Sequence, residues 1–142
     1  MFAEDLNYWQ TSKSSPDVWV ERSRRQLEEL GAKIEAEGFG MDSKGRSAYM
    51  LAFSIQGDAF KIIWPVMKSN KENERASRVQ AATMLYHYVK GVALRAAVCG
   101  TRDAFFSHLA LPDGRVASQV ASDELLELGD LFPKQIQIPY KK

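Results

Sequence analysis

The sequence predicts one α+β domain, made of an N-terminal helix, a three-stranded antiparallel meander, a long buried helix and short C-terminal helices. Apolar residues recur at helical spacing over 15–30 and 75–99, and they alternate with period two over 33–66. Glycine or proline separates most of these stretches. With 142 residues, 45% of them hydrophobic, the chain is long enough to bury a core, and its single cysteine excludes an intrachain disulfide.

Residues 1–14 form a polar lead-in with three aromatic residues, which is either frayed or held by those aromatics. Ser15-Pro16 predicts the start of the first helix, because serine is a favoured N-cap and proline lacks only an N–H that would have no helical partner. We expect this helix to end at Gly31. Its inward stripe is expected to consist of Val20, Ser23, Leu27 and Leu30.

Three strands are expected to follow, over 33–39, 47–55 and 59–66. The last two are the strongest signal, since the turn residues Gln56-Gly57-Asp58 separate two runs of alternating apolar residues. A tight loop at Gly57-Asp58 predicts that Ile55 pairs with Phe60, Phe53 with Ile62 and Leu51 with Trp64. A one-residue slip would put the large apolar side chains on opposite faces, so only two- or four-residue loops are allowed.

The long helix is expected over 75–99, closed by Gly100. Apolar residues occur nearly all round it, with Leu94 and Val98 lying away from the main apolar face, so we expect both sides of the helix to be covered. The first helix, the C-terminal segment or a second subunit would cover the side that the sheet leaves open. Cys99 is expected to be a small buried hydrophobe.

After this helix we expect a short helix from Thr101, a turn at Leu111–Gly114, a short strand over 115–118 and a last helix over 123–128. An extended tail over 133–142 completes the chain. The predicted organisation is therefore a lead-in over 1–14, a single domain over 15–132 and this tail.

The sequence contains no convincing catalytic constellation, so we predict a protein that is not an enzyme and has no cofactor or metal. Only His87 and His108 are bases at neutral pH, and Cys99 lies about 18 Å along the helix from His87, too far for a dyad. We expect His87 to be solvated and His108 to be a half-buried imidazole. We expect Glu35 and Glu37 to lie on one face of the first strand. Together with Asp58 and Lys61 they form only part of a metal-dependent nuclease site, so a metal-dependent enzyme is a weaker alternative.

Charge is distributed unevenly, although the net charge is only +1. Residues 61–102 contain eight Lys/Arg and two Asp/Glu, whereas 1–60 and 103–142 are net acidic. Concentrated cations favour phosphates or an acidic partner, and ordinary surface solvation is the competing interpretation. The candidate nucleic-acid-binding residues are Lys61, Trp64, Lys68, Lys71, Arg75 and Arg78.

A groove between sheet and helix with this lining would hold a single strand, its cations following the phosphates and Trp64 stacking on a base. The alternative is that Trp64 belongs to the core, because it shares a strand face with Phe60 and Ile62. Both interpretations of Trp64 stay open from the sequence, the core one being favoured.

The order and spacing of several segments carry a resemblance to a known family. Over about residues 20–118, the sequence resembles a family of small uncharacterised proteins of bacterial prophages and other mobile elements. The segments are Ser23–Ala32, Ala52–Ile63 with Pro65, the long helix, and Phe105 through Leu-Pro-Asp-Gly to Arg115. The family has no assigned activity, and its long helix is richer in Arg, Lys and Trp than Met84–Lys90 is here. The predicted architecture is also similar to the core of single-strand annealing recombinases, which hold DNA in a basic groove.

The leading prediction is a non-enzymatic nucleic-acid-binding accessory protein of phage or mobile-element origin, single-strand-binding or annealing-like and oligomeric. The alternative is a protein-interaction module, an inhibitor or assembly factor, that acts through an oligomeric or host-protein interface. No apolar run approaches the roughly 18 residues of a membrane span, and the N-terminus is polar and acidic, so we expect a cytoplasmic protein without membrane contact.

Overall fold

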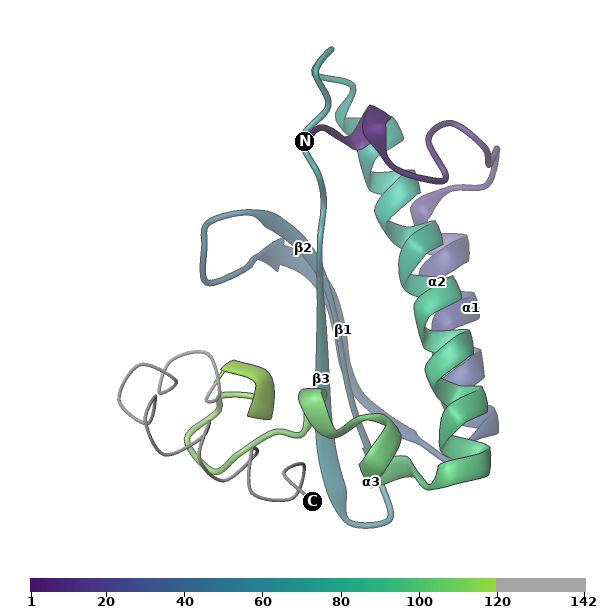
Figure 1. Ribbon diagram of the computed structural model, residues 1–142, viewed down its shortest axis with the longest axis vertical. Helices are drawn as coiled ribbons and strands as arrows, with labels where there is room; N and C mark the ends of the chain where they lie inside the picture. Colours follow the sequence, from purple (N-terminus) through teal and green to yellow (C-terminus); the bar gives the residue numbers. More distant parts are fainter. Residues whose placement is uncertain (120–142) are drawn as a thin grey trace, which may run out of the picture.

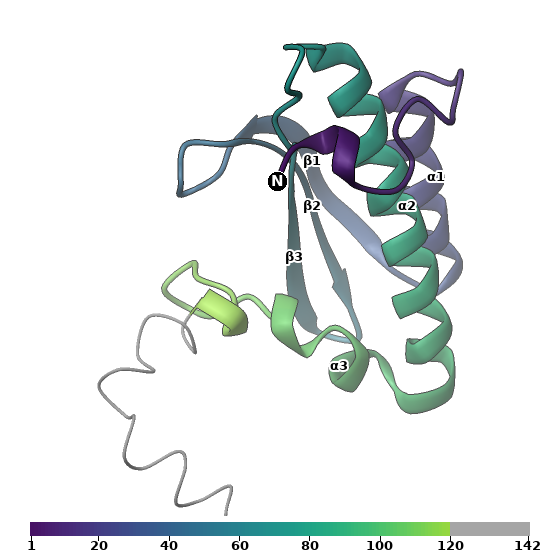
Figure 2. The ribbon, with the colours of Figure 1, turned by 45° about the horizontal axis from the view of Figure 1, so that its top comes forward.

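The computed structural model describes residues 1–119, so the expected helix over 123–128 and the tail over 133–142 lie outside the described residues. Two helices cover one face of a three-stranded antiparallel sheet of order β1-β2-β3 (Figures 1 and 2), which confirms the α+β class. The elements are η1 (Ala3–Asp5), α1 (Pro16–Glu29), β1 (Lys33–Met41), β2 (Ser47–Ile55), β3 (Asp58–Pro65), α2 (Glu74–Cys99), α3 (Thr101–Ala104) and η2 (Phe106–His108).

The first helix begins and ends where the sequence predicts. Pro16 is its first residue, Ser15 takes the extended N-cap backbone, and Gly31 follows its end with φ +99°. Such a φ is favourable for glycine and strained for other residues. Ser23 and Leu27 are fully buried, which confirms the centre of the predicted stripe.

The β2–β3 hairpin keeps the predicted faces but not the predicted pairs. Its two loop residues are Gln56 and Gly57, with φ +53° and +85°, as a type I′ loop requires. The predicted partners are therefore wrong by two residues, although the parity argument holds because a two-residue shift keeps every side chain on its face. The observed pairs are Ile55 with Asp58, Phe53 with Phe60, Leu51 with Ile62 and Tyr49 with Trp64.

Strand β1 contains an irregularity that changes the faces of its acidic residues. The register shifts between Ile34 and Ala36, as in a β-bulge. Glu35 accepts a hydrogen bond from Ser54 on one side of the sheet, whereas Glu37 forms an ion pair with Arg24 of α1 on the other. The expectation that both carboxylates share a face is wrong, because one extra residue reverses the alternation.

The core lies between α2 and the inner face of the sheet, with α1 packed beside α2. Its aromatic centre consists of Phe53, Phe60 and Phe105, whose ring centroids are 5.3 to 5.7 Å apart. Phe105 comes from the segment after α2, so the backbone reversal at Gly100 returns the chain to the sheet.

Helix α2 is not covered all round. Its first half is buried on several sides, but Leu94 and Val98 are exposed, and so is Cys99. The prediction of a buried Cys99 is wrong, because no described element packs over that side of the last turns. The expectation of cover on both sides holds for the first half of the helix only.

The lead-in is held against the fold, which decides between the two alternatives for it. The buried amide Nε2 of Gln80 donates to the carbonyl oxygens of Ala3 and Asn7, at 2.7 and 3.0 Å. The ring of Tyr8 stacks on His87 with centroids 4.8 Å apart. This segment therefore crosses the beginning of α2, as both ribbon views show.

Beyond α2, the chain runs along the free edge of β3. Phe60 forms a bridge with Leu109, and the amide of Ala110 donates to the carbonyl of Ala59. The turn at Leu111–Gly114 is confirmed by a hydrogen bond between these two residues. The expected strand over 115–118 is wrong, because only Val116 forms a bridge, with Ala110, and residues 117–119 are helical.

Candidate functional site

The structure does not bring the six predicted binding residues onto one surface. Lys61 and Trp64 are three positions apart on β3, and strand alternation places them on opposite faces of the sheet. Lys61 pairs across the sheet with Ala52, and its Nζ lies 3.4 Å from the carbonyl oxygen of Gly114. The expected groove with all six residues in its lining is therefore not formed.

Trp64 is engaged inside the fold. Its ring packs against Tyr88 of α2, with centroids 5.2 Å apart, and the side chain is partly buried against the core. The structure thus favours the core interpretation of Trp64 over an open platform for a base.

The remaining four cations follow one another along the connector and into α2. Lys68, Lys71 and Arg75 are exposed, and Arg78 is half-buried. Asn73 caps α2 by accepting a hydrogen bond from the amide of Ala76. This hydrogen bond fixes the first turn of the helix, and Arg75 extends from that turn and Arg78 from the start of the next.

The lead-in fixes the connector as well. Glu4 accepts hydrogen bonds from the Ser69 hydroxyl and the Asn70 amide, and the amide of Ala3 donates to the carbonyl of Lys68. These hydrogen bonds lower the pKa of Glu4 against the raising effect of burial. The cationic connector is tied at several points to a segment that is more than 60 residues away in the sequence.

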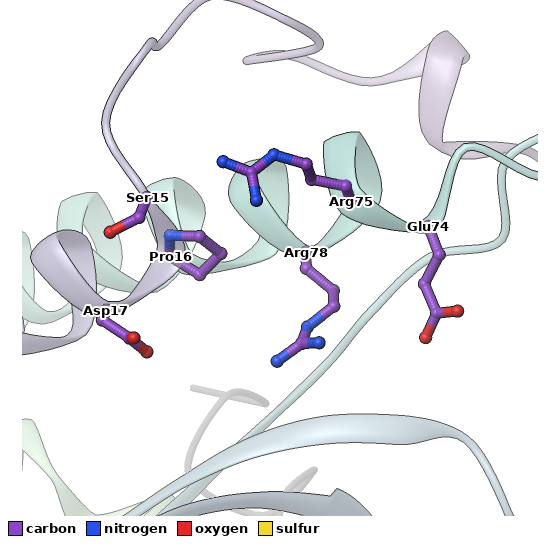
Figure 3. A pocket seen from close by; sticks show the side chains of 6 residues that line it. All are labelled: Ser15, Pro16, Asp17, Glu74, Arg75 and Arg78. Carbon is purple, nitrogen blue, oxygen red and sulfur yellow. The ribbon is translucent and has the colours of Figure 1, made fainter.

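Arg75 and Arg78 line a shallow pocket where α1 and α2 both begin (Figures 1 and 3). The pocket measures about 360 Å³, and its other lining residues are Ser15, Pro16, Asp17 and Glu74. Helix N-termini and guanidinium groups both favour anions, while Asp17 and Glu74 reduce the positive potential. The side chains of Arg75 and Arg78 extend in different directions from α2.

Arg78 is held in place by aromatic side chains. Its guanidinium carbon lies 4.1 Å above the ring centroid of Phe39, and its Nε lies 3.5 Å from the hydroxyl of Tyr49. Burial raises the pKa of Tyr49, and the nearby Arg78 opposes that rise. No sequence pattern predicts this aromatic support, because Phe39 and Tyr49 are brought to α2 by the β1–β2 pairing.

Neither Arg75 nor Arg78 forms an ion pair with any residue among 1–119. Most of the other arginines of this region have a carboxylate within 4 Å. These are Arg24, Arg25, Arg46, Arg95, Arg102 and Arg115. The guanidinium groups of Arg75 and Arg78 therefore have no carboxylate within 4 Å among the described residues, although Asp17 and Glu74 line the same pocket.

The two histidines lie apart from this site. His87 is exposed beneath Tyr8, and His108 is half-buried beside Tyr88, as the sequence predicts. Among residues 1–119 there is no group of three or more His, Cys, Asp or Glu side chains placed to hold a metal ion. The same residues include no helix with the length and apolar character needed to cross a membrane.

Comparison of the chain with protein families, curated proteins and solved structures gives no match. The resemblance to prophage and mobile-element proteins therefore stays a prediction.

Proposed function

We propose that this chain is a non-enzymatic nucleic-acid-binding accessory protein that contacts backbone phosphates at the start of α2. The supporting observation is that Arg75 and Arg78 have no carboxylate partner among residues 1–119, although six other arginines there do. Lys68 and Lys71 extend the same positive region along the connector. A phage or mobile-element origin and a cytoplasmic location belong to this proposal.

Phosphates are the chemical groups that this arrangement favours. Exposed cations on a fixed helix start neutralise phosphate charge and release counterions, which requires no particular base. Because Trp64 packs on Tyr88, it does not supply the stacked face that a dedicated single-strand site would use. We therefore expect binding that depends on salt and shows little preference for base sequence.

The test is a fluorescence anisotropy titration of the full chain with a labelled single-stranded DNA, its DNA duplex and the matching RNA duplex, each at several salt concentrations. Each phosphate contact contributes roughly 0.7 to 0.9 to the slope of log affinity against log salt. Arg75→Ala/Arg78→Ala is expected to lower that slope by about 1.5. Arg75→Glu/Arg78→Glu is expected to abolish measurable binding.

The matched control is Lys33→Glu/Lys61→Glu, which changes the net charge by the same amount on the outer face of the sheet. This control is expected to reduce affinity only slightly. No binding to any of the three nucleic acids at low salt contradicts the proposal, and so does an equal loss of affinity in the control.

A further inference from the structure

The second half of α2 carries an apolar surface that residues 1–119 leave largely exposed. Leu94 and Val98 are 70% and 79% exposed. Gly91 precedes Leu94 by three residues, and Val98 follows it by four, so the three positions share one side of the helix. We name Gly91, Leu94 and Val98 the α2 patch.

A groove runs beside this patch, between the end of α1 and the middle of α2. Its volume is about 490 Å³. Glu29 and Leu30 lie on the α1 wall, and Lys90 and Leu94 lie on the α2 wall. The exposed side chains of Leu94 and Val98 therefore lie next to a groove. Glu29 is on one wall of this groove and Lys90 is on the other.

The glycine at position 91 indicates that another helix approaches α2 closely at this point. Glycine inside a helix is less favourable than alanine, and Gly91 is not in the left-handed region that would require it. A Cβ atom at position 91 would meet no atom within 4 Å among the described residues. No contact among the described residues requires the absence of a side chain at position 91. A second helix that docks on α2 could approach its backbone closely at this glycine.

We propose that a second copy of this chain docks on the α2 patch, with the two α2 helices antiparallel about a two-fold axis near Leu94. In this arrangement Leu94 of each copy meets Leu94 of the other, and Val98 lies over the other copy's Gly91. The same symmetry brings Glu29 of one copy toward Lys90 of the other, so the charges of the groove are self-complementary. The α2 patch and the groove beside it place apolar side chains, a hollow and both charges on one surface, as a self-complementary two-fold interface requires.

The proposed dimer is independent of the proposed nucleic-acid contact. Arg75 lies 16 residues before Gly91 on the same helix, which places it about 25 Å away along the axis. The antiparallel arrangement would present the two arginine sites at opposite ends of the dimer.

The first experiment is sedimentation equilibrium of the full chain over a wide concentration range. The wild type is expected to show a monomer–dimer equilibrium, and Leu94→Asp or Val98→Asp is expected to raise the dissociation constant at least about tenfold. Met41→Asp removes an equally exposed apolar side chain from β1 and serves as the matched control. Far-ultraviolet circular dichroism checks that each variant is folded.

Gly91→Leu separates the dimer from helix stability. Leucine favours the helix over glycine, so thermal stability of the monomer should rise while dimerisation is lost. If this variant dimerises as the wild type does, close approach at Gly91 is excluded and the proposal is overturned.

A charge exchange identifies the partner as a second copy in this orientation. Glu29→Lys alone and Lys90→Glu alone should each weaken self-association, whereas a mixture of the two variants should form a heterodimer with opposite charges at both contacts. If mixing the two variants does not strengthen association, the antiparallel arrangement is overturned.

A wild type that remains monomeric at every concentration overturns the proposed dimer. In that case, Leu94→Cys is prepared in a Cys99→Ser background and treated with a maleimide. Slow labelling of this cysteine would mean that residues 120–142 of the same chain, and not a second copy, cover the α2 patch.

Discussion

The hydroxyl oxygen of Tyr88 lies 2.6 Å from Nε2 of His108, which joins the long helix to the segment that follows it. The Tyr88 ring also packs against Trp64 of β3, and His108 forms a hydrogen bond with the backbone of Lys61. One small cluster thus connects α2, β3 and η2. In the neutral tautomer protonated at Nδ1, Nε2 accepts a hydrogen bond from the Tyr88 hydroxyl, and in the other neutral tautomer Nε2 donates to it.

This contact predicts that stability falls in mildly acidic solution. Burial lowers the pKa of His108, while the hydrogen bond with Lys61 opposes this shift. Because the folded-state pKa lies below the unfolded value of about 6.5, the stabilisation is complete above that pH and is lost as the pH falls toward the folded-state pKa. Thermal unfolding should therefore show a lower Tm at about pH 5 than at about pH 7.5.

His108→Gln should flatten this pH dependence, since glutamine does not titrate. His87→Gln is the matched control, because His87 is exposed and stacks only on its surface neighbours. Parallel pH profiles for the wild type and His108→Gln would contradict the assignment.

Replacement of Gln80 tests how the lead-in is held. Gln80→Leu roughly keeps the volume of the side chain but removes the donor that holds the carbonyls of Ala3 and Asn7 to α2, and the Ala3 carbonyl keeps only the hydrogen bond from the Leu6 amide within the lead-in. The free energy of unfolding should fall by about 1–3 kcal/mol in urea titrations. Hydrogen exchange over residues 1–10 should rise, because the segment loses its attachment to α2.

Thr83→Val is the control for this prediction. The Thr83 hydroxyl donates within its own helix to the carbonyl of Val79, so its loss frees no other segment. If Thr83→Val increases exchange over residues 1–10 as much as Gln80→Leu does, the proposed attachment is wrong.

Phe105 and Phe106 form an internal pair for a packing test. Phe105 is fully buried against Phe53 and Phe60, whereas Phe106 is 58% exposed. Phe105→Ala should lower the free energy of unfolding by about 3–5 kcal/mol. Phe106→Ala should change it by less than about 0.5 kcal/mol. Similar urea midpoints for the two variants would exclude Phe105 as the main contact of this segment.

The hairpin loop offers a stabilising substitution. Gln56 has φ +53°, a left-handed conformation that asparagine adopts more readily in type I′ loops. Gln56→Asn should raise the free energy of unfolding by about 0.5 kcal/mol, and Gln56→Val should lower it by about 1 kcal/mol, because β-branched residues disfavour this backbone. A stabilising effect of valine would show that the loop is not at Gln56-Gly57.

Much of the fold could be predicted from the sequence. The bounds of α1 and α2 are confirmed within a residue or two because Ser15-Pro16, Gly31 and Gly100 are local signals of helix ends. The candidate site could be predicted only in part. Arg75 and Arg78 meet at one pocket, but Lys61 and Trp64 lie on opposite faces of the sheet, which agrees with the alternation that favours Trp64 as a core residue.

The sequence by itself determined which residues share a helix side or a strand face, because backbone periodicity acts over a few neighbouring residues. Only the tertiary structure decided which of the allowed registers the hairpin takes, where the bulge in β1 reverses its faces, and which side of α2 stays open. These features depend on contacts between segments far apart in the chain, such as the packing of Phe105 on β2 and β3 and the bonds from Gln80 to the lead-in. Local patterns do not encode such contacts, since their free energy arises only when the elements have come together.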